Sequence, residues 1–206
     1  MIILLFSQRV NFFYNKGIIC YYLIMKKKIF IGINLPEATK QKLVDYQEKI
    51  DRFFDDGCPI KWTKKDNLHI TMFFIGFVEY DQLIEVFNKT EKALKNLGSF
   101  KIELESITYG PLGKTPKMVW ANGKKIPSIV EANRKLEEEL FEIKATEHNF
   151  TPHITLGKIV QWQFKKIDED QIPQIEEYLN ISFDINSIDI MESVKGKYIV
   201  LKSINL

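Results

Sequence analysis

Residues 67–76, "NLHITMFFIG", and residues 150–159, "FTPHITLGKI", carry the same tripeptide, His-Ile-Thr, followed each time by apolar residues. The chain has only three histidines, yet two of them, His69 and His153, stand in near-identical surroundings 84 positions apart. The apolar and β-branched residues around each copy indicate a strand. Because alternate side chains of a strand point to the same face, each histidine shares a face with the threonine two positions later.

The elements expected around the two copies follow a similar order in each half of the chain. Alternating and β-branched runs predict strands, and apolar residues at intervals of three and four predict helices. We expect strands over residues 28–35, 60–63, 69–78, 100–110, 116–123, 153–160, 182–193 and 198–206. We expect helices over residues 36–54, 80–98 and 127–143, and a short helical piece over residues 171–179. Each half supplies a strand, a helix and a His-Ile-Thr strand, so the sequence predicts an α+β fold with two similar lobes derived from a duplication.

A pseudo-two-fold relation between the lobes would bring four polar side chains to one cleft: His69, Thr71, His153 and Thr155. An unperturbed imidazole titrates near pH ~6.5, so two of them suit a reaction that removes a proton at one place and delivers one at another. Two hydroxyl groups suit an anion, and a phosphate in an in-line displacement collects charge on its non-bridging oxygens. A single histidine on an apolar strand is usually structural, whereas two copies in matching strands favour a catalytic pair.

The sequence does not indicate a cofactor or a metal. A catalytic zinc normally has three protein ligands, and neither copy places a carboxylate beside its histidine, so we expect chemistry without a metal or cofactor. Cys20 and Cys58 lie far apart without a Cys-x-x-Cys spacing, which favours a reducing cytoplasm over a disulfide framework. "GPLGKT" at residues 110–115 has two residues between Gly and Gly-Lys where a phosphate-binding loop has four, so no ATP site is predicted.

Composition places the chain among ordinary globular proteins. Its 206 residues include 45% hydrophobic residues, enough for a core, and 27% charged residues of nearly balanced sign. This balance excludes a basic surface that binds RNA through bulk charge, so any RNA contact must be local. Residues 1–24 are apolar and aromatic, but polar residues interrupt them too early for a membrane span of ~20 residues. We interpret residues 1–24 as a misassigned start or a disordered extension, and residues 25–206 as a single bilobal domain without a membrane anchor.

The pair "HITMFF" and "HITLGK" resembles the doubled His-x-Thr motifs of the 2H phosphoesterase superfamily. More closely, the chain resembles the bacterial and archaeal RNA 2',3'-cyclic phosphodiesterases, formerly called 2'-5' RNA ligases. The likeness covers nearly all of residues 28–206, including "IFIGINLPEATKQKL", "IKWTKKDNLHITMFFIG", "YGPLGKTPKMVWA" and "FTPHITLGKI". It implies a bilobal fold in which two antiparallel sheets line a central cleft and the helices lie outside.

The resemblance also implies an activity: metal-independent hydrolysis of a 2',3'-cyclic phosphate, at an RNA end or on a nucleotide, to a 2'-phosphate. By analogy, His153 would be the general base on water and His69 the general acid on the leaving 3' oxygen. Thr71 and Thr155 match the phosphate-binding threonines of the family. Many relatives carry Arg three positions beyond the second threonine, where this chain has Lys158, which keeps the charge but loses the planar guanidinium.

Further candidate substrate contacts lie near the two motifs in the sequence. Trp62, Tyr109 and Phe150 are candidates for stacking on bases, although burial in the core explains each of them equally well. His148 is expected in a polar loop without a chemical role. Five lysines form either a basic rim for the RNA backbone or ordinary solvated surface: Lys61, Lys64, Lys65, Lys114 and Lys117.

Two other functions are compatible with the same sequence. The fold could cleave or ligate 2'-5' linked oligonucleotides or hydrolyse a cyclic phosphate on a small nucleotide. A protein of another class would bind RNA ends through the two motifs without catalysis, although the intact histidine and threonine in both motifs speak against a decayed site. The sequence indicates no stable protein partner, and we expect a monomer because it has no heptad pattern.

Overall fold

The computed structural model describes residues 26–54, 57–111, 115–145 and 150–206, so the predicted leader, residues 1–24, lies outside the described residues. The strands are β1 (Lys27–Asn34), β2 (Ile60–Trp62), β3 (His69–Val78), β4 (Phe100–Gly110), β5 (Met118–Gly123), β6 (His153–Ile159), β7 (Glu177–Ile185), β8 (Ser187–Val194) and β9 (Lys197–Asn205). The helices are α2 (Glu37–Asp51), α3 (Gln82–Leu94), α4 (Pro127–Leu140) and α5 (Gln161–Phe164), with 3-10 turns η2 (Lys65–Asn67) and η3 (Glu169–Gln171).

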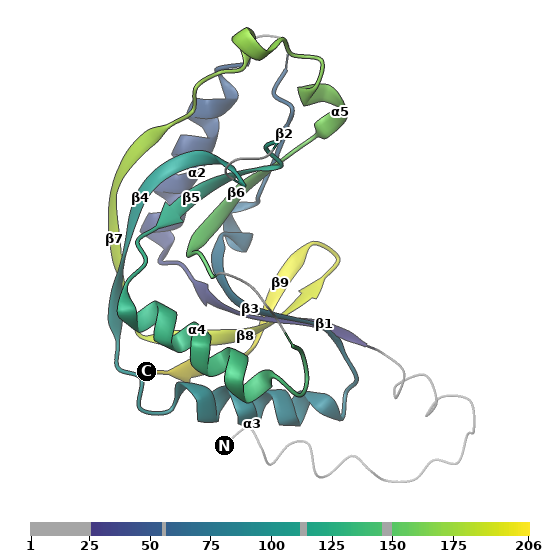
Figure 1. Cartoon of the computed structure of the whole chain (residues 1–206), viewed down its shortest axis with the longest axis vertical. Coiled ribbons are helices and arrows are strands. Elements are labelled where there is room, and N and C mark those ends of the chain that lie inside the picture. The colour runs from purple at the N-terminus through teal and green to yellow at the C-terminus, as the bar shows by residue number, and fades with distance from the viewer. Residues whose placement is uncertain (1–25, 55–56, 112–114, 146–149) are drawn as a thin grey trace, which may run out of the picture.

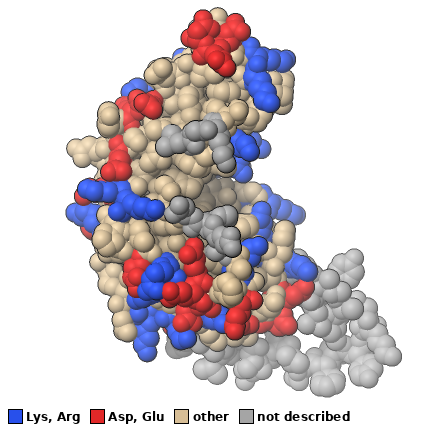
Figure 2. All heavy atoms as spheres, viewed as in Figure 1, with Lys and Arg blue, Asp and Glu red and all other residues tan. Residues whose placement is uncertain are grey.

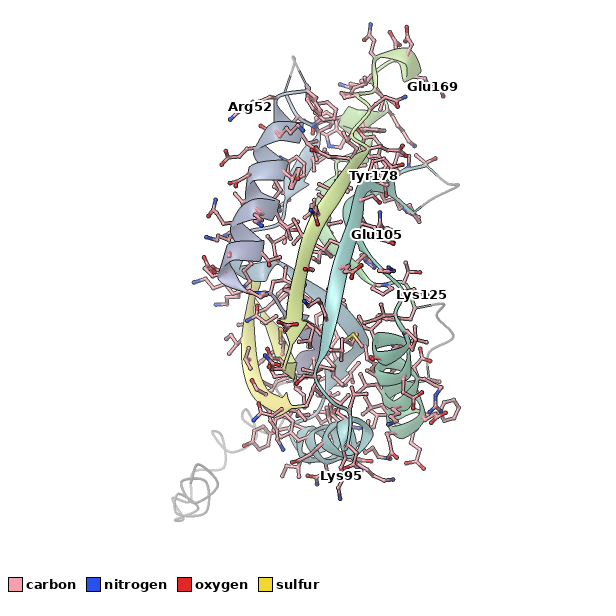
Figure 3. The ribbon with its side chains drawn as sticks, turned by 90° about the vertical axis from the view of Figure 1, so that its left-hand side faces the viewer. Arg52, Lys95, Glu105, Lys125, Glu169 and Tyr178 are labelled. Atoms are coloured by element: carbon pink, nitrogen blue, oxygen red, sulfur yellow. The ribbon has the colours of Figure 1, made fainter. Side chains whose placement is uncertain are left out.

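Within these residues the strands form one antiparallel sheet in the order β7-β4-β5-β6-β3-β1-β8-β9, with β2 beside β6. The sheet bends into two lobes (Figure 1). The first lobe contains β3, β1, β8 and β9, with α3 and α4 on its outer side, and the second contains β7, β4, β5, β6 and β2, with α2 outside (Figures 1 and 3). The predicted α+β fold with two lobes is confirmed, and the two expected sheets are joined where β3 meets β6.

Apolar periodicity explains why these elements form and which sides they bury. In β7 every second residue is buried, from Leu179 to Ile185, as expected for a strand with one face on the core. In α3, Leu83, Val86 and Leu94 are buried, so the helix lays one stripe against the first lobe. The helix-covered face of the sheet therefore packs against an apolar core in each lobe. The opposite face of the sheet carries the polar side chains of the strands.

Two sequence predictions near the C-terminus were wrong. The short helix expected over residues 171–179 is replaced by the turn η3 and the start of β7, because the alternation of buried residues from Glu177 onward has the period of a strand. The single strand expected over residues 182–193 is two strands separated at Asn186, since β7 pairs with β4 in the second lobe and β8 pairs with β1 in the first. Tertiary pairing, which short-range pattern does not reveal, decides both cases.

Charge is distributed unevenly over the surface. In the view of Figure 2, Lys and Arg side chains border the notch between the lobes, whereas acidic side chains gather over α3 and α4 and at the far tip of the second lobe. Among the described residues, no helix combines the length and the apolar character that crossing a membrane requires.

Candidate active site

The two His-Ile-Thr segments meet at the junction of the lobes. His69 begins β3 and His153 begins β6, and the two strands pair antiparallel with Ile70 opposite Ile154. Both isoleucines are fully buried. One step along each strand from this pair, the antiparallel register sets His69 beside Thr155 and Thr71 beside His153, on the face opposite to the isoleucines. The structure therefore brings the four polar side chains together on one face.

Each histidine ring is held by the backbone carbonyl two residues before it. The Nδ1 atom of His69 lies 2.7 Å from the oxygen of Asn67, and Nδ1 of His153 lies 2.8 Å from the oxygen of Thr151. A carbonyl oxygen can only accept, so Nδ1 carries a proton in both rings and Nε2 is the lone-pair nitrogen of the neutral form. In His69 this Nε2 lies 2.9 Å from Oγ1 of Thr71, whose hydroxyl donates to it. The two rings therefore hold the same tautomer.

Aromatic side chains that the sequence analysis did not single out fix the planes of the two imidazoles. The ring of His69 has its centroid 4.9 Å from the centroids of both Phe30 and Tyr198. The ring of His153 lies 4.3 Å from Trp120 at an interplanar angle of 32°, which is close to stacking. The sequence placed Phe30, Trp120 and Tyr198 on predicted strands but gave no further signal that they contact the histidines. Which aromatic side chain reaches a histidine depends on which strands pair.

Buried amides on the outer helices hold both motif strands in the same way. Asn133 of α4 donates from Nδ2 to the carbonyl of Met72, which follows Thr71, at 2.7 Å. Gln47 of α2 donates from Nε2 to the carbonyl of Leu156, which follows Thr155, at 2.8 Å. Both amides are almost fully buried. A buried donor that lost its acceptor would cost about 1–3 kcal/mol, so these bonds tie each His-Ile-Thr strand to its helix.

Burial sets the protonation state of both histidines. The pKa of His69 is lowered from its ordinary value mainly by burial, and further by the positive charges of His153 and Lys40, while its bond to Asn67 acts in the opposite direction. The pKa of His153 is also lowered, again mainly by burial. Lys40 is buried on α2, and sequence analysis missed it. Both rings are therefore neutral at pH 7 in the free protein.

These lowered pKa values predict how stability depends on pH. The unfolded chain protonates its histidines near pH 6.5, the ordinary value, whereas the folded chain does so only at lower pH. The unfolded state therefore binds more protons below pH ~6.5, and the free energy of unfolding falls as the pH decreases from there. Urea unfolding between about pH 8 and pH 5 should show a steeper decrease for the natural chain than for a His69→Gln/His153→Gln variant. Equal pH slopes would contradict the lowered pKa values.

The remaining predicted contact residues divide between the two faces of the second lobe. Lys158 is exposed on β6 and pairs with Lys61 of β2, so two lysines stand side by side next to the phosphate-binding candidate Thr155. Trp62 packs against Gly157 and donates from Nε1 to Asp51 of α2 at 2.7 Å.

Tyr109 donates its hydroxyl to the carbonyl of Pro173 at 3.1 Å and packs against Phe164. Its cross-strand partner is the fully buried Val119, on the helix-covered side of the sheet. Trp62 and Tyr109 thus point away from the histidines, and neither is part of the proposed site. Phe150 is partly buried and packs against the core.

Of the other residues considered from sequence, Lys65 forms an ion pair with Glu37 rather than a free rim charge. His148 and Lys114 lie outside the described residues. Over the part of the chain that the structure describes, no group of three His, Cys, Asp or Glu residues is arranged to hold a metal ion.

The sequence of this chain matches a protein family and named relatives. The family model described as "2'-5' RNA ligase superfamily" matches residues 44–197. A protein of Methanocaldococcus jannaschii named RNA 2',3'-cyclic phosphodiesterase is 29% identical over 157 residues, covering 76% of this chain and 83% of the relative. A protein of the same name from Thermotoga maritima is 25% identical over 154 residues, covering 72% and 80%.

Solved structures share the fold. The structure of TT0787 from Thermus thermophilus superimposes with a TM-score of 0.72 at 20% identity and covers 88% of this chain and 98% of its own. The structure of LigT from E. coli in complex with 3'-AMP gives a TM-score of 0.70 at 19% identity, covering 88% and 99%. At these identities the likeness establishes the bilobal fold.

Proposed function

Because the chain belongs to the 2'-5' RNA ligase superfamily, which is enzymatic, we propose that it hydrolyses 2',3'-cyclic phosphate ends of RNA to 2'-phosphomonoesters with His69 and His153 as the catalytic pair. Phosphoesterase activity follows from the family, and the predicted enzyme class is confirmed. The observation that supports the specific reaction is the shared face of β3 and β6, where two neutral imidazoles stand beside two threonine hydroxyls. Relatives that are 25–29% identical carry the name of this activity.

The hydrogen bonds of the two rings favour His153 as the general base. Nε2 of His69 already accepts from the hydroxyl of Thr71, whereas Nε2 of His153 has no hydrogen-bond partner among the described residues. An unoccupied lone pair is what a base needs to take a proton from water. The water oxygen attacks phosphorus, and its proton goes to Nε2 of His153.

His69 completes the reaction as general acid. The negative charge of a bound phosphodiester would raise the pKa of the nearby His69, so its Nε2 takes up a proton when substrate binds. As the bond between phosphorus and the 3' oxygen breaks, that proton moves to the leaving oxygen and a 2'-phosphate remains. Protons then exchange with solvent to restore both rings.

Thr71 and Thr155 are placed to hold the phosphate between the two rings. Once Nε2 of His69 is protonated and no longer accepts from Thr71, each hydroxyl can donate to a non-bridging oxygen, where charge accumulates in the transition state. The exposed pair Lys61 and Lys158 stands next to Thr155 and would attract the anionic backbone of RNA. This positive charge is confined to one place, as expected for a chain whose numbers of basic and acidic residues are nearly equal.

Incubation of the purified protein with 2',3'-cyclic AMP in the presence of EDTA tests this function. We expect 2'-AMP as the product, resolved from 3'-AMP by chromatography, because the proposed mechanism breaks the bond to the 3' oxygen. Formation of 3'-AMP would contradict the assigned leaving group. Cleavage of a 2'-5' linked dinucleotide with no opening of the cyclic phosphate would select the alternative substrate, and tight binding of a phosphate end without turnover would select the binding protein.

A further inference from the structure

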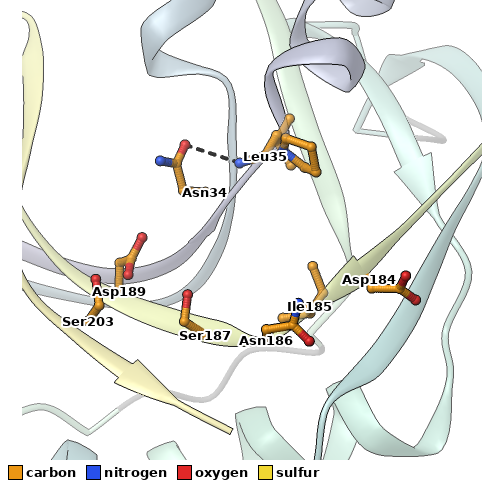
Figure 4. A pocket seen from close by; sticks show the side chains of 9 residues that line it. Asn34, Leu35, Asp184, Ile185, Asn186, Ser187, Asp189 and Ser203 are labelled. Atoms are coloured by element: carbon orange, nitrogen blue, oxygen red, sulfur yellow. Dashed lines mark hydrogen bonds between the residues drawn. The ribbon is translucent and has the colours of Figure 1, made fainter.

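A polar cavity of about 290 Å³ lies where β1 leads into α2 and β7 leads into β8 (Figure 4). It does not include either histidine or either motif threonine. Its lining combines amide, hydroxyl and carboxyl groups, and none of its lining residues is Lys or Arg. The polar residues around it are Asn34, Asp184, Asn186, Ser187, Asp189 and Ser203.

Asp189 is the buried acidic group of this cavity. It is 5% exposed, and its Oδ1 atom is buried without a hydrogen-bond partner in the described part of the chain. Figure 4 shows its carboxyl group pointing from β8 into the cavity, beside the hydroxyl groups of Ser187 and Ser203. A carboxyl oxygen that is removed from water and left unpaired is unfavourable, so this arrangement favours a ligand that supplies hydrogen-bond donors.

The residues that line the cavity favour an ammonium group over a metal ion. A metal ion stripped of its water needs a larger set of ligands than two carboxylates, and the described residues contain no cluster of three metal-ligating side chains. A primary ammonium group instead carries three N–H donors, which match three oxygens, Oδ1 of Asp189 and the hydroxyls of Ser187 and Ser203. The cavity is also several times larger than a water molecule's share of about 30 Å³, which leaves room for a short aliphatic body.

We propose that this cavity binds the primary ammonium group of a small aliphatic amine through Asp189, Ser187 and Ser203. The proposal concerns a site separate from the catalytic pair, and it does not depend on the reaction proposed above. Asp184 also borders the cavity, but it is exposed and pairs across strands with Lys101 of β4, so the carboxyl group available to the ligand is that of Asp189. The ligand class is therefore a small primary aliphatic amine, for which putrescine serves as the probe.

The proposed site is linked to the catalytic face through a residue without a side chain. Gly32 of β1 pairs with Thr71 on one side and with Asp189 on the other, and Asp189 pairs with Ser203. Cross-strand partners share a face, and a Cβ built on Gly32 would lie 3.4 Å from the ring of His69. Two strand spacings separate Thr71 from Asp189, about 10 Å. An amine bound at Asp189 would offset its negative charge close to where the phosphate is proposed to bind.

Titration calorimetry and thermal unfolding with putrescine test the site. We expect putrescine to bind the full chain and raise its unfolding temperature. The neutral analogue 1,4-butanediol should do neither, because it lacks the charge. Asp189→Asn keeps the shape and removes the charge, and should weaken putrescine binding by roughly 10-fold or more. The matched control Asp45→Asn changes an exposed carboxyl group on α2, outside the cavity, and should leave binding unchanged.

Three results would overturn the proposal: no putrescine binding at millimolar concentration, equal binding by the Asp189→Asn variant, or protection by Mg²⁺ without protection by putrescine. If Asp189→Asn does not fold, Ser203→Ala decides, because it removes one acceptor from an exposed position and preserves the charge. Binding weakened by roughly three-fold or more in Ser203→Ala supports the site, and unchanged binding rejects it. None of these readouts measures turnover, so an inactive protein would still reveal whether the cavity binds an amine.

Discussion

Replacing His69 or His153, the proposed catalytic pair, by alanine should lower kcat on a 2',3'-cyclic nucleotide by at least ~100-fold, while the protein remains folded. His69→Ala removes the proposed proton donor to the 3' oxygen, and His153→Ala removes the proposed base that activates water. The two losses should not multiply in the double variant, because residues that act as one unit give non-additive effects. Steady-state turnover, with product resolved by chromatography, measures the change. The matched control is His148→Ala, which alters the third histidine and should retain full activity.

A substrate with sulfur in place of the 3' oxygen separates the two roles. A thiolate leaves without receiving a proton, so it needs no general acid. His69→Ala should therefore recover most of its lost rate on this substrate, whereas His153→Ala should stay slow because water must still be deprotonated. Recovery by His153→Ala instead would exchange the two assignments. Activity near the natural level in either alanine variant on the ordinary substrate would reject the paired mechanism.

The features that the sequence predicts well are those that depend on local pattern. The α+β class, the two lobes and the positions of His69 and His153 at the starts of strands all follow from periodicity and from a repeated tripeptide. The period of two along a strand also fixes which side chains share a face, so the sequence pattern alone groups Thr71 with His69. Family resemblance added the substrate class, which no periodicity contains.

The features that sequence misses depend on pairing between distant strands. Trp120 packs against His153 because β5 lies beside β6, and Tyr198 reaches His69 although 129 residues separate them in the chain. Trp62 lies closer to His69 in sequence, yet it turns toward α2 and donates to Asp51. Proximity along the chain therefore suggested Trp62 and Tyr109, which point away from the histidines, and did not single out Phe30, Trp120 and Tyr198, which contact them.

The buried amides show a different limit. Gln47 and Asn133 interrupt the apolar stripes of α2 and α4, and a polar residue within such a stripe signals a specific buried partner. Sequence cannot say which carbonyl accepts the bond. Only the structure reveals that both amides bond the residue after a motif threonine, so the two lobes repeat the support of the site as well as the motif itself.

Ile154→Ala should give the largest loss of stability, about 2–5 kcal/mol of the free energy of unfolding. Ile154 is fully buried and pairs with Ile70, and in the described residues this pair is the point where β3 and β6 are joined. The substitution removes packed atoms and leaves a cavity beneath the face that carries the two histidines. Urea unfolding with a linear extrapolation measures the change.

The matched control is Ile199→Ala on β9, where the same side chain is 48% exposed and the expected change lies within about 0.5 kcal/mol. Because the isoleucine pair also sets the distance between the two imidazoles, folded Ile154→Ala protein should show a lower kcat than the Ile199→Ala protein at the same temperature. A loss of stability below about 1 kcal/mol would show that the junction between the lobes is held elsewhere. A large loss of stability with full kcat would show that the Ile70–Ile154 pair supports the fold without setting the spacing of the two imidazoles.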